Sequence, residues 1–279
     1  MKLIHDLNCY QDRIEQQIQT ITTQLGPASP LRDACEYALL SGGKRFRPAL
    51  VLMIAETLEN HVDASYAALA IEAFHTASLI ADDLPCMDND DERRNQPSLH
   101  KKYDETTALL ASYAMIAAGY ELVSQNSLQL NDPERGLIAI QITSKNTGLH
   151  GATGGQYLDI NPPHLTKEVI LDVIQKKTVS LFEIAFSYGW IFGGGDLKSL
   201  PLVKKASEHF GMAFQITDDI GDTEQDIVNG RQINLANFLG HEEATKMFHV
   251  ELKKFEECVG ELGLGGSGVA FLEELLSHR

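Results

Sequence analysis

The chain has 279 residues, 43% of them hydrophobic, and a formal net charge of −16. This composition suits a large buried core and excludes a disordered chain. The acidic balance argues against a nucleic-acid partner, because phosphate binding requires a basic face. The sequence contains no run of about 18 apolar residues, so it does not predict a membrane span. The N-terminus lacks the apolar core of a secretory signal, so we expect a cytoplasmic protein without stable membrane insertion. The four cysteines are far apart in sequence and are expected to be reduced thiols.

Most of the chain is predicted to be helical, because apolar residues recur three and four positions apart in long segments. These segments are 31–40, 48–60, 63–82, 105–128, 134–148, 167–192 and 199–220. Glycine and proline clusters separate them, and Asp132-Pro133 is a favourable helix start. The glycines at 260–268 predict a loop before a short last helix. We therefore expect one all-α domain, residues 1–279, of roughly a dozen helices around a shared core.

A first group of carboxylates, Asp82, Asp83 and Asp88, follows the apolar segment 63–82. Pro85 lies between them and has no backbone N–H, so the helix should end or kink near Asp83. Without this break, Asp82 and Asp88 would not share a face. Mg²⁺ prefers oxygen ligands and commonly binds one or two carboxylates together with substrate phosphates. Taken alone, the segment is also compatible with a solvated acidic loop. We call these three residues the first Asp cluster.

A second group, Asp218, Asp219 and Asp222, ends the apolar segment 199–220. Asp218 and Asp222 are four residues apart and stack on one helix face, with Gln215 on nearly the same side. Like charges at this spacing repel unless a cation bridges them. An exposed acidic helix end is again the alternative for this group by itself. Two such groups are better explained by one shared cleft that holds several divalent ions. These residues form the second Asp cluster.

Basic residues gather at three places in this acidic chain. The segment Gly42-Gly43-Lys44-Arg45-Phe46-Arg47-Pro48 combines a glycine pair, which lets the backbone approach an anion, with cationic donors. Arg93-Arg94 directly follows the first Asp cluster, and Lys176-Lys177-Thr178 lies in a predicted helix. These residues are candidates for binding a diphosphate that metal ions cover only in part.

The chain resembles the short-chain trans-prenyl diphosphate synthases, the family of farnesyl and geranylgeranyl diphosphate synthases. The resemblance covers about residues 35–240 and includes both Asp clusters, the Gly42–Pro48 segment and Arg93-Arg94, together with His75, Gly154-Gly155-Gln156-x2-Asp159, Lys177-Thr178 and Phe214-Gln215. It implies an isoprenoid-synthase-like helical bundle with a central cleft, usually as a homodimer. The implied activity is that of a transferase, which condenses isopentenyl diphosphate head-to-tail with allylic diphosphates to make a C20 or C15 diphosphate.

The resemblance also implies roles for individual residues. Asp82, Asp83, Asp88, Asp218, Asp219 and Asp222 would hold three Mg²⁺ ions per active site. Lys44, Arg47, His75 and Arg94 would bind isopentenyl diphosphate, and Arg93, Lys177 and Gln215 would contact the allylic diphosphate or its metals. Lys177, Thr178 and Gln215 are the expected catalytic residues, with Thr178 and Gln215 orienting dipoles toward the allylic cation.

Product length is expected to depend on residues that precede Asp82 in the same helix. Ala77 and Ser78 are small and lie five and four residues earlier, whereas the family uses an aromatic residue there to stop growth at fifteen carbons. Phe74 would lie about 12 Å beneath Asp82 at the helical rise and form the floor of a tunnel. We therefore expect a twenty-carbon product over a fifteen-carbon one.

The segment after Asp222 departs from the family pattern. It is shortened and has no lysine, and Arg231 is a candidate substitute for one of the two lysines usually found there. This departure leaves open a non-catalytic or regulatory subunit of a heteromeric synthase. A class I terpene cyclase is a further alternative, because such enzymes also use Asp-rich metal motifs.

Overall fold

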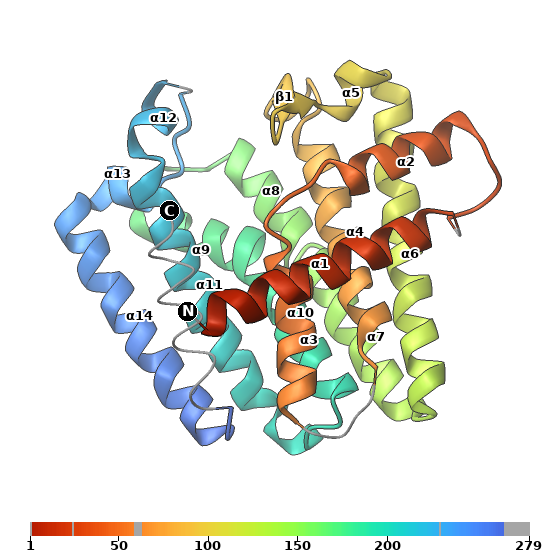
Figure 1. Ribbon diagram of the computed structural model, residues 1–279. Helices are drawn as coiled ribbons and strands as arrows, with labels where there is room; N and C mark the ends of the chain where they lie inside the picture. Colours follow the sequence, from red (N-terminus) through yellow and green to blue (C-terminus); the bar gives the residue numbers. More distant parts are fainter. Residues whose placement is uncertain (1, 24, 59–62, 229, 265–279) are drawn as a thin grey trace. The chain divides into compact units, whose positions relative to one another are not determined.

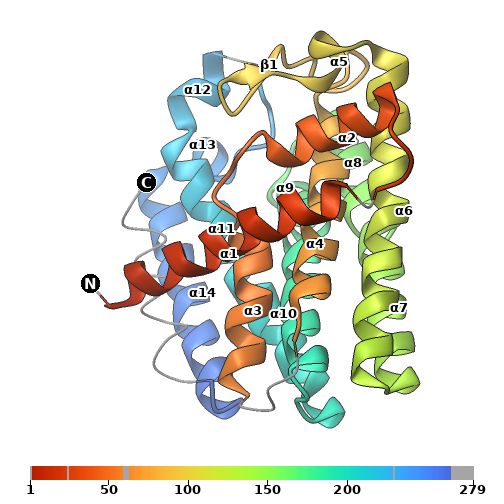
Figure 2. The same cartoon turned by 45° about the vertical axis from the view of Figure 1, so that its right-hand side comes forward.

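The computed structural model describes residues 2–23, 25–58, 63–228 and 230–264 (Figures 1 and 2). The chain forms two compact units. The N-terminal unit comprises His5–Gln141 and Tyr188–Gly195, and the C-terminal unit comprises Met1–Ile4, Ile142–Ser187 and Asp196–Arg279. Helices α1, α7 and α10 contribute residues to both units. The expectation of a single domain stays a prediction, and each unit is described by itself below.

The described residues are mainly helical, which confirms the all-α prediction. The helical elements in chain order are α1 (Lys2–Thr22), α2 (Pro30–Leu40), α3 (Phe46–Thr57), α4 (Ser65–Asp82), α5 (Leu99–Lys102), α6 (Glu105–Leu130), α7 (Pro133–Thr147), α8 (Ala152–Ile160), α9 (Lys167–Ile174), the π-helical turn η1 (Gln175–Val179), α10 (Ser180–Phe192), the 3-10 turn η2 (Leu197–Ser199), α11 (Leu200–Gly221), α12 (Thr223–Val228), α13 (Leu235–Leu239) and α14 (His241–Glu261). Within the described part of the chain, strands occur in one antiparallel hairpin, β1 (Glu92–Arg93) with β2 (Gln96–Pro97).

The seven helical segments predicted from periodicity all exist, with boundaries shifted by a few residues at most. Residues 59 and 60 of the predicted segment 48–60, and the short last helix expected after residues 260–268, lie outside the described residues. The sequence did not predict α1, α5, α8, η2 or α12 to α14. The hairpin was also missed, because two-residue strands are too short to show an alternating pattern.

Helix α4 lies at the centre of the N-terminal unit and packs against α2, α3 and α6; Figure 1 shows it running beside α6. Its many alanines let neighbouring helices approach closely, and it is buried on nearly all sides. The Phe74 ring lies where a side chain on Gly119 of α6 would be, and it meets Tyr120 edge-on with ring centroids 5.1 Å apart. Burying a side chain such as Phe74 stabilises the fold by about 1.5–3 kcal/mol.

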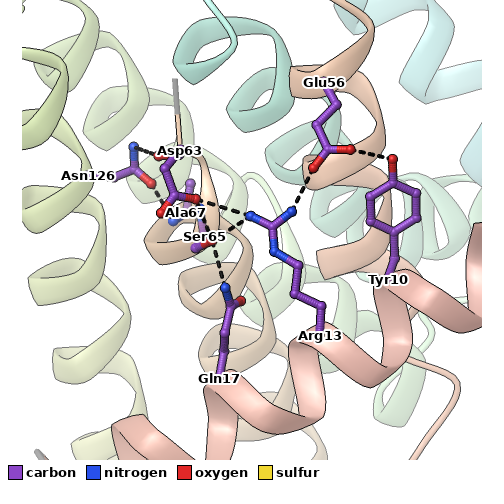
Figure 3. A network of polar contacts seen from close by, with 8 residues as sticks. All are labelled: Tyr10, Arg13, Gln17, Glu56, Asp63, Ser65, Ala67 and Asn126. Carbon is purple, nitrogen blue, oxygen red and sulfur yellow. Dashed lines mark hydrogen bonds and ion pairs between the residues drawn. The ribbon is translucent and has the colours of Figure 1, made fainter. Parts of the chain in front are cut away.

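A polar network attaches α1 to the ends of α3 and α4 in the N-terminal unit (Figure 3). Arg13 donates to Glu56 Oε1 at 2.6 Å and to Ser65 Oγ at 3.0 Å. Asn126 of α6 is fully buried, and its Oδ1 accepts from Ala67 N at 2.9 Å. Since buried polar groups are costly unless they are hydrogen-bonded, Asn126 holds the start of α4, whereas the exposed bonds of Arg13 only supplement the packing of α1.

The C-terminal unit is built around α11, which packs against α14 and α13, as Figure 2 shows. Phenylalanines form much of its core: the rings of Phe182 and Phe210 lie 4.9 Å apart, and Phe210 also contacts Phe255 at 5.5 Å. Gly211 lets α11 pass closely over Val179. This packing holds the C-terminal end of α11, where the second Asp cluster lies.

Helix α6 is long and apolar enough to cross a membrane, by length and composition alone. In its most apolar 18-residue window, 39% of the residues are buried in the structure. Core helices of ordinary globular proteins pass the same test, and α6 packs against α4 and α2. The absence of stable membrane insertion therefore stays a prediction.

Candidate functional site

The first Asp cluster lies where α4 ends. As predicted from Pro85, the helix stops at Asp82, and Asp83 is its C-cap. The following loop folds back, so that Asp88 N donates to Asp82 O at 2.9 Å. The turn thus brings together the backbones of the two aspartates that the sequence predicted to share a face. Burial raises the pKa of Asp83, and the hydrogen bonds and charge of Arg93 oppose that shift.

Arg93 approaches Asp83 with two guanidinium nitrogens. Its Nε donates to Asp83 Oδ1 at 2.9 Å, and its Nη2 contacts the same oxygen. Its Nη2 also reaches Asp90 Oδ2 at 3.1 Å. Asp83 is only 3% exposed, so the side chain of this central aspartate is already engaged by the protein.

The glycine pair allows Arg94 to lie close to the basic loop. Arg94 donates to Gly42 O, and its guanidinium occupies the place where a Cβ on Gly43 would lie. Gly43 also has a φ of 129°, a backbone conformation that residues with a side chain rarely adopt. Lys44 is exposed, whereas Arg45 is buried and pairs with Glu72 and Glu15. The structure therefore divides this loop into exposed and internal cations, a division that the sequence did not show.

His75 lies among arginines in the N-terminal unit. Burial lowers its pKa well below the ordinary value, and the charge of Arg47 and of other nearby arginines lowers it further. His75 is therefore neutral near pH 7. Arg47 Nη1 lies 3.4 Å from His75 Nε2, which makes Nε2 the acceptor and leaves the ring proton on Nδ1. Nδ1 is buried, and no hydrogen-bond partner for it occurs among the residues that the structure describes.

The three residues predicted to set product length are all on α4. Phe74 and Ala77 are buried on the side that meets α6, where Ser112 Oγ donates to Ala77 O at 3.0 Å. Ser78 is half-buried, and its hydroxyl donates to His75 O at 2.8 Å. Space near Ala77 is therefore limited by α6 as well as by the residues of α4 itself.

The second Asp cluster lies in the last turn of α11. Asp222 N donates to Asp218 O at 2.9 Å, while Asp218 is half-buried and Asp222 is exposed. Asp219 is buried, and both of its oxygens accept hydrogen bonds: Oδ1 from Gln215 Nε2 at 2.8 Å and Oδ2 from Leu235 N at 2.7 Å. Burial raises the pKa of Asp219 to about 6 despite these bonds.

The predicted catalytic residues Lys177 and Thr178 lie in the π-helical turn η1, between α9 and α10. Single π-helical turns inside α-helices are frequent at functional sites. Thr178 Oγ1 donates to Gln215 Oε1 at 2.6 Å, so the structure brings these two residues together. Lys177 Nζ is 2.6 Å from Asp159 Oδ2. Asp159, which the sequence analysis names only as a member of the motif Gly154-Gly155-Gln156-x2-Asp159, is thus a partner of Lys177.

The segment after Asp222 forms α12 and a turn that returns to α13. Arg231, the predicted lysine substitute, lies 3.9 Å from Asp226 Oδ1. Asn234 is fully buried behind Asp219. No sequence pattern singles out Asn234, because its partners are 8 and 15 residues away.

The donor chemistry of both clusters fits Mg²⁺. Among the residues that the structure describes, no three or more histidine, cysteine or acidic side chains lie together so that they could hold a metal ion by themselves. Mg²⁺ does not require one, because it is usually bound through one or two carboxylates and completes its shell with water and substrate phosphates. The carboxylates therefore suit ions shared with a diphosphate rather than a closed metal cage.

The all-helical architecture and the two helices that end in Asp clusters are typical of the isoprenoid synthase fold. The geranyltransferase from Legionella pneumophila has a solved structure that matches this chain with a TM-score of 0.85 and 28% identity, over 98% of this chain and 94% of that one. Residues 28–233 match the family model for polyprenyl synthetase. The chain belongs to the polyprenyl synthetase family, which confirms the resemblance noted from its motifs.

Two curated relatives show the range of the family. The chain is 36% identical over 219 residues to geranylgeranyl pyrophosphate synthase 3, chloroplastic, of Arabidopsis thaliana, which covers 74% of this chain and 61% of the plant protein. It is 30% identical over 280 residues to farnesyl diphosphate synthase of Bacillus subtilis, covering 95% and 94%. The chain thus spans less than two thirds of the plant relative's length and nearly all of the bacterial one.

Proposed function

We propose that this chain is a prenyl diphosphate synthase, a transferase that condenses isopentenyl diphosphate head-to-tail with allylic diphosphates. One observation carries the proposal. In each unit an apolar helix ends in an Asp cluster, and the same unit contains side chains of the family's motifs that contact one another or the cluster. In the N-terminal unit these are Arg93 and the His75–Arg47 pair, and in the C-terminal unit they are Thr178 and Gln215. The names of the relatives, farnesyl and geranylgeranyl synthases, support the same reaction.

Four aspartates would hold Mg²⁺ directly: Asp82, Asp88, Asp218 and Asp222. Asp83 and Asp219 are engaged by Arg93 and by Gln215 and Leu235 N, so we propose that they orient their neighbours or complete the metal shell. Three ions per active site are the number that the family resemblance implies. Bound Mg²⁺ would stabilise the negative charge that develops on the departing diphosphate.

The cationic residues would bind the two diphosphates. Lys44, Arg47 and Arg94 supply charge for isopentenyl diphosphate, and the Nδ1–H of neutral His75 supplies a hydrogen-bond donor for a phosphate oxygen. Arg93 and Lys177 would contact the allylic diphosphate. These positions follow the motif order and remain proposals.

The chemical step needs no nucleophilic side chain. The allylic C–O bond breaks and releases pyrophosphate, and the double bond of isopentenyl diphosphate attacks the resulting cation. Transfer of a proton from the new cation to the released pyrophosphate then restores a double bond. Thr178 and Gln215 would direct their oxygen dipoles at the cation. Their mutual hydrogen bond of 2.6 Å fixes both side chains before the substrate arrives.

A direct assay tests this activity. The purified chain is incubated with isopentenyl diphosphate and dimethylallyl, geranyl or farnesyl diphosphate, with Mg²⁺ or with EDTA, and the products are separated by chromatography. We expect Mg²⁺-dependent elongation by the chain alone, which would contradict the regulatory-subunit alternative. Farnesyl diphosphate alone is the control for a terpene cyclase, which would release a hydrocarbon or an alcohol. No elongation with any starter would contradict the proposal.

We propose a twenty-carbon main product, because Ala77 and Ser78 are small. Ala77→Tyr should shift the product toward fifteen carbons, since the larger side chain would block a prenyl tail that runs along α4. Ala77→Ser adds only a hydroxyl and should keep the wild-type distribution. Chromatography of the dephosphorylated products measures the effect. An unchanged distribution for Ala77→Tyr would show that the tail does not pass this residue.

We further propose a homodimer in the cytoplasm. Leu109, Leu110, Tyr113 and Ile116 are exposed on α6 at a spacing that places them along one helix face. An apolar face of this kind is typical of interaction sites. The four cysteines are free, which is compatible with a reducing compartment. Light scattering during size-exclusion chromatography should give twice the chain mass, and Tyr113→Asp should lower it.

A further inference from the structure

The last turn of α11 is closed by a side chain from outside the helix. The final carbonyls of a helix have no partner within it and require donors from elsewhere. Asn234 Nδ2 donates to Asp219 O at 2.9 Å and supplies such a donor. Asn234 is fully buried, so water does not offer an alternative partner. The backbone that carries Asp218 and Asp222 is therefore held by this amide.

The same amide joins two other elements to α11. Its second N–H reaches Asp226 Oδ2 of α12 at 2.8 Å, and its Oδ1 accepts from Asn237 N at 2.8 Å, which caps α13. Both donors and the acceptor of Asn234 are thus used. Asparagine fits this place because it combines two N–H donors with an acceptor, which no carboxylate or hydroxyl side chain does.

The network continues from Asn234 to the predicted catalytic residues. Leu235 N, the next donor along the chain, binds Asp219 Oδ2, and Gln215 binds Asp219 Oδ1. Gln215 in turn accepts from Thr178. A shift of Asn234 would move the backbone of Asp219 and the N-terminus of α13 together, and hence the bonds that orient Gln215.

Asp226 of the shortened segment after Asp222 also belongs to this network. Arg231 N donates to Asp226 O at 2.9 Å and closes the turn, and the Arg231 side chain lies near the Asp226 carboxylate. Asp226 is buried, and Asn234 and Arg231 both approach it. Asn234 therefore links Asp226, in the segment that lacks the family's lysines, to Asp219 of α11.

We infer that Asn234, together with Asp226, is a positioning residue of the second Asp cluster. By bridging Asp219 O and Asp226 it fixes the last turn of α11, so that Asp218 and Asp222 present their carboxylates together to metal ions. This inference rests on the proposed function of the cluster. It also assigns a role to the segment that departs most from the family pattern.

The test compares three variants. Asn234→Asp keeps the acceptor for Asn237 N, loses both N–H donors and adds a charge beside Asp219 and Asp226. Asn234→Ser keeps a good helix cap, which protects folding, but cannot bridge to Asp226. Asn126→Asp is the matched control, because Asn126 is equally buried and also uses its amide as donor and acceptor, toward Asp63 and Ala67 (Figure 3).

The readout is the rise in Tm that Mg²⁺ with inorganic pyrophosphate produces, titrated with Mg²⁺ and measured by scanning fluorimetry. For both Asn234 variants, the Mg²⁺ concentration that gives half of this rise should increase about tenfold, as is usual when a residue behind a metal ligand is lost. Asn126→Asp should lower Tm without Mg²⁺ but leave the half-effect concentration unchanged.

The outcomes separate the two proposals. Equal Mg²⁺ dependence in wild type and in both Asn234 variants would overturn the positioning role and leave the proposed activity intact. An equal increase of the half-effect Mg²⁺ concentration in Asn126→Asp would also overturn the positioning role, because the effect would then reflect general stability. A wild-type chain that neither elongates substrates nor responds to Mg²⁺ and pyrophosphate would overturn the proposed function itself.

Discussion

A charged partner holds Asp83, the buried aspartate of the first Asp cluster, whereas amide groups hold Asp219, the buried aspartate of the second. In the N-terminal unit Arg93 binds Asp83, and Arg45 binds Glu72. In the C-terminal unit the donors to Asp219 are Gln215 and a backbone N–H. In a buried ion pair, each charge depends on its partner to offset the free-energy cost of removing it from water. Neutral hydrogen-bond donors offset only part of this cost for a buried carboxylate. The two clusters should therefore respond differently to substitution and to pH.

The largest effect is expected from Arg45→Met. Arg45 is 3% exposed and its partner Glu72 is 1% exposed, so the substitution leaves an uncompensated buried carboxylate. Such a change typically destabilises a protein by about 3–5 kcal/mol. Urea unfolding of the variant and of wild type measures the difference in free energy.

Two further variants make this prediction specific. Arg45→Met combined with Glu72→Met should recover most of the lost stability, because apolar side chains of similar volume often replace buried pairs without loss. Arg13→Met removes the ion pair with Glu56, in which both side chains are well exposed, and should cost at most about 1 kcal/mol. A small effect of Arg45→Met by itself would show that Glu72 does not carry a charge in the fold.

The sequence predicted the helices whose signals are local. Pro85 correctly placed the end of α4, and Asp132-Pro133 placed the start of α7, because a missing N–H and a capping side chain act within one turn. Helix α1 was missed although Ile14, Ile18 and Ile21 are buried at helical spacing, since polar residues dominate the rest of its length. Local patterns thus predicted most of the fold.

The candidate site was predictable where a motif names a residue, and less so where a distant partner decides its role. Both Asp clusters and the Thr178–Gln215 pair follow from motifs. The burial of Arg45 depends on Glu72, 27 residues away, and the role of Asn234 depends on Asp219. No periodicity or spacing rule contains these contacts. They arise when tertiary packing chooses a partner for each buried polar group.

Asp219→Asn should reveal the difference in pH response. Burial raises the pKa of Asp219 from 3.8 to about 6, so the folded state binds this proton more tightly than the unfolded state. Its contribution to stability is therefore present at low pH and is lost as the pH rises through 6. Without Mg²⁺, the stability of the variant relative to wild type should increase by about 2–3 kcal/mol between pH 4 and pH 7. Parallel curves of Tm against pH would contradict this.

At a fixed pH the variant also loses a bond. Asparagine offers one acceptor where Asp219 offers two, so either Gln215 or Leu235 N loses its partner, at a cost of about 1–3 kcal/mol. We therefore expect Asp219→Asn to be less stable than wild type near pH 4 and comparable to it or more stable near pH 7. The carboxylate of Asp219 is then kept for its chemistry at the expense of stability.

His75→Gln should give a smaller effect of the opposite sign. The pKa of His75 is lowered below 6.5 in the folded state, first by burial and then by Arg47 and its neighbours. The unfolded chain therefore binds this proton more tightly, and the stability due to neutral His75 is lost as the pH falls below 6.5. Glutamine does not titrate, so the stability of the variant relative to wild type should improve as the pH falls from 7 toward 5.

Exposed His164 provides a matched control, because His164→Gln should leave the pH profile of Tm unchanged. If the His75 and His164 variants gave the same profile, the arginines around His75 would not disfavour its charged form, and an electrostatic distinction between the two clusters would have to rest on Arg93 and Arg45 alone.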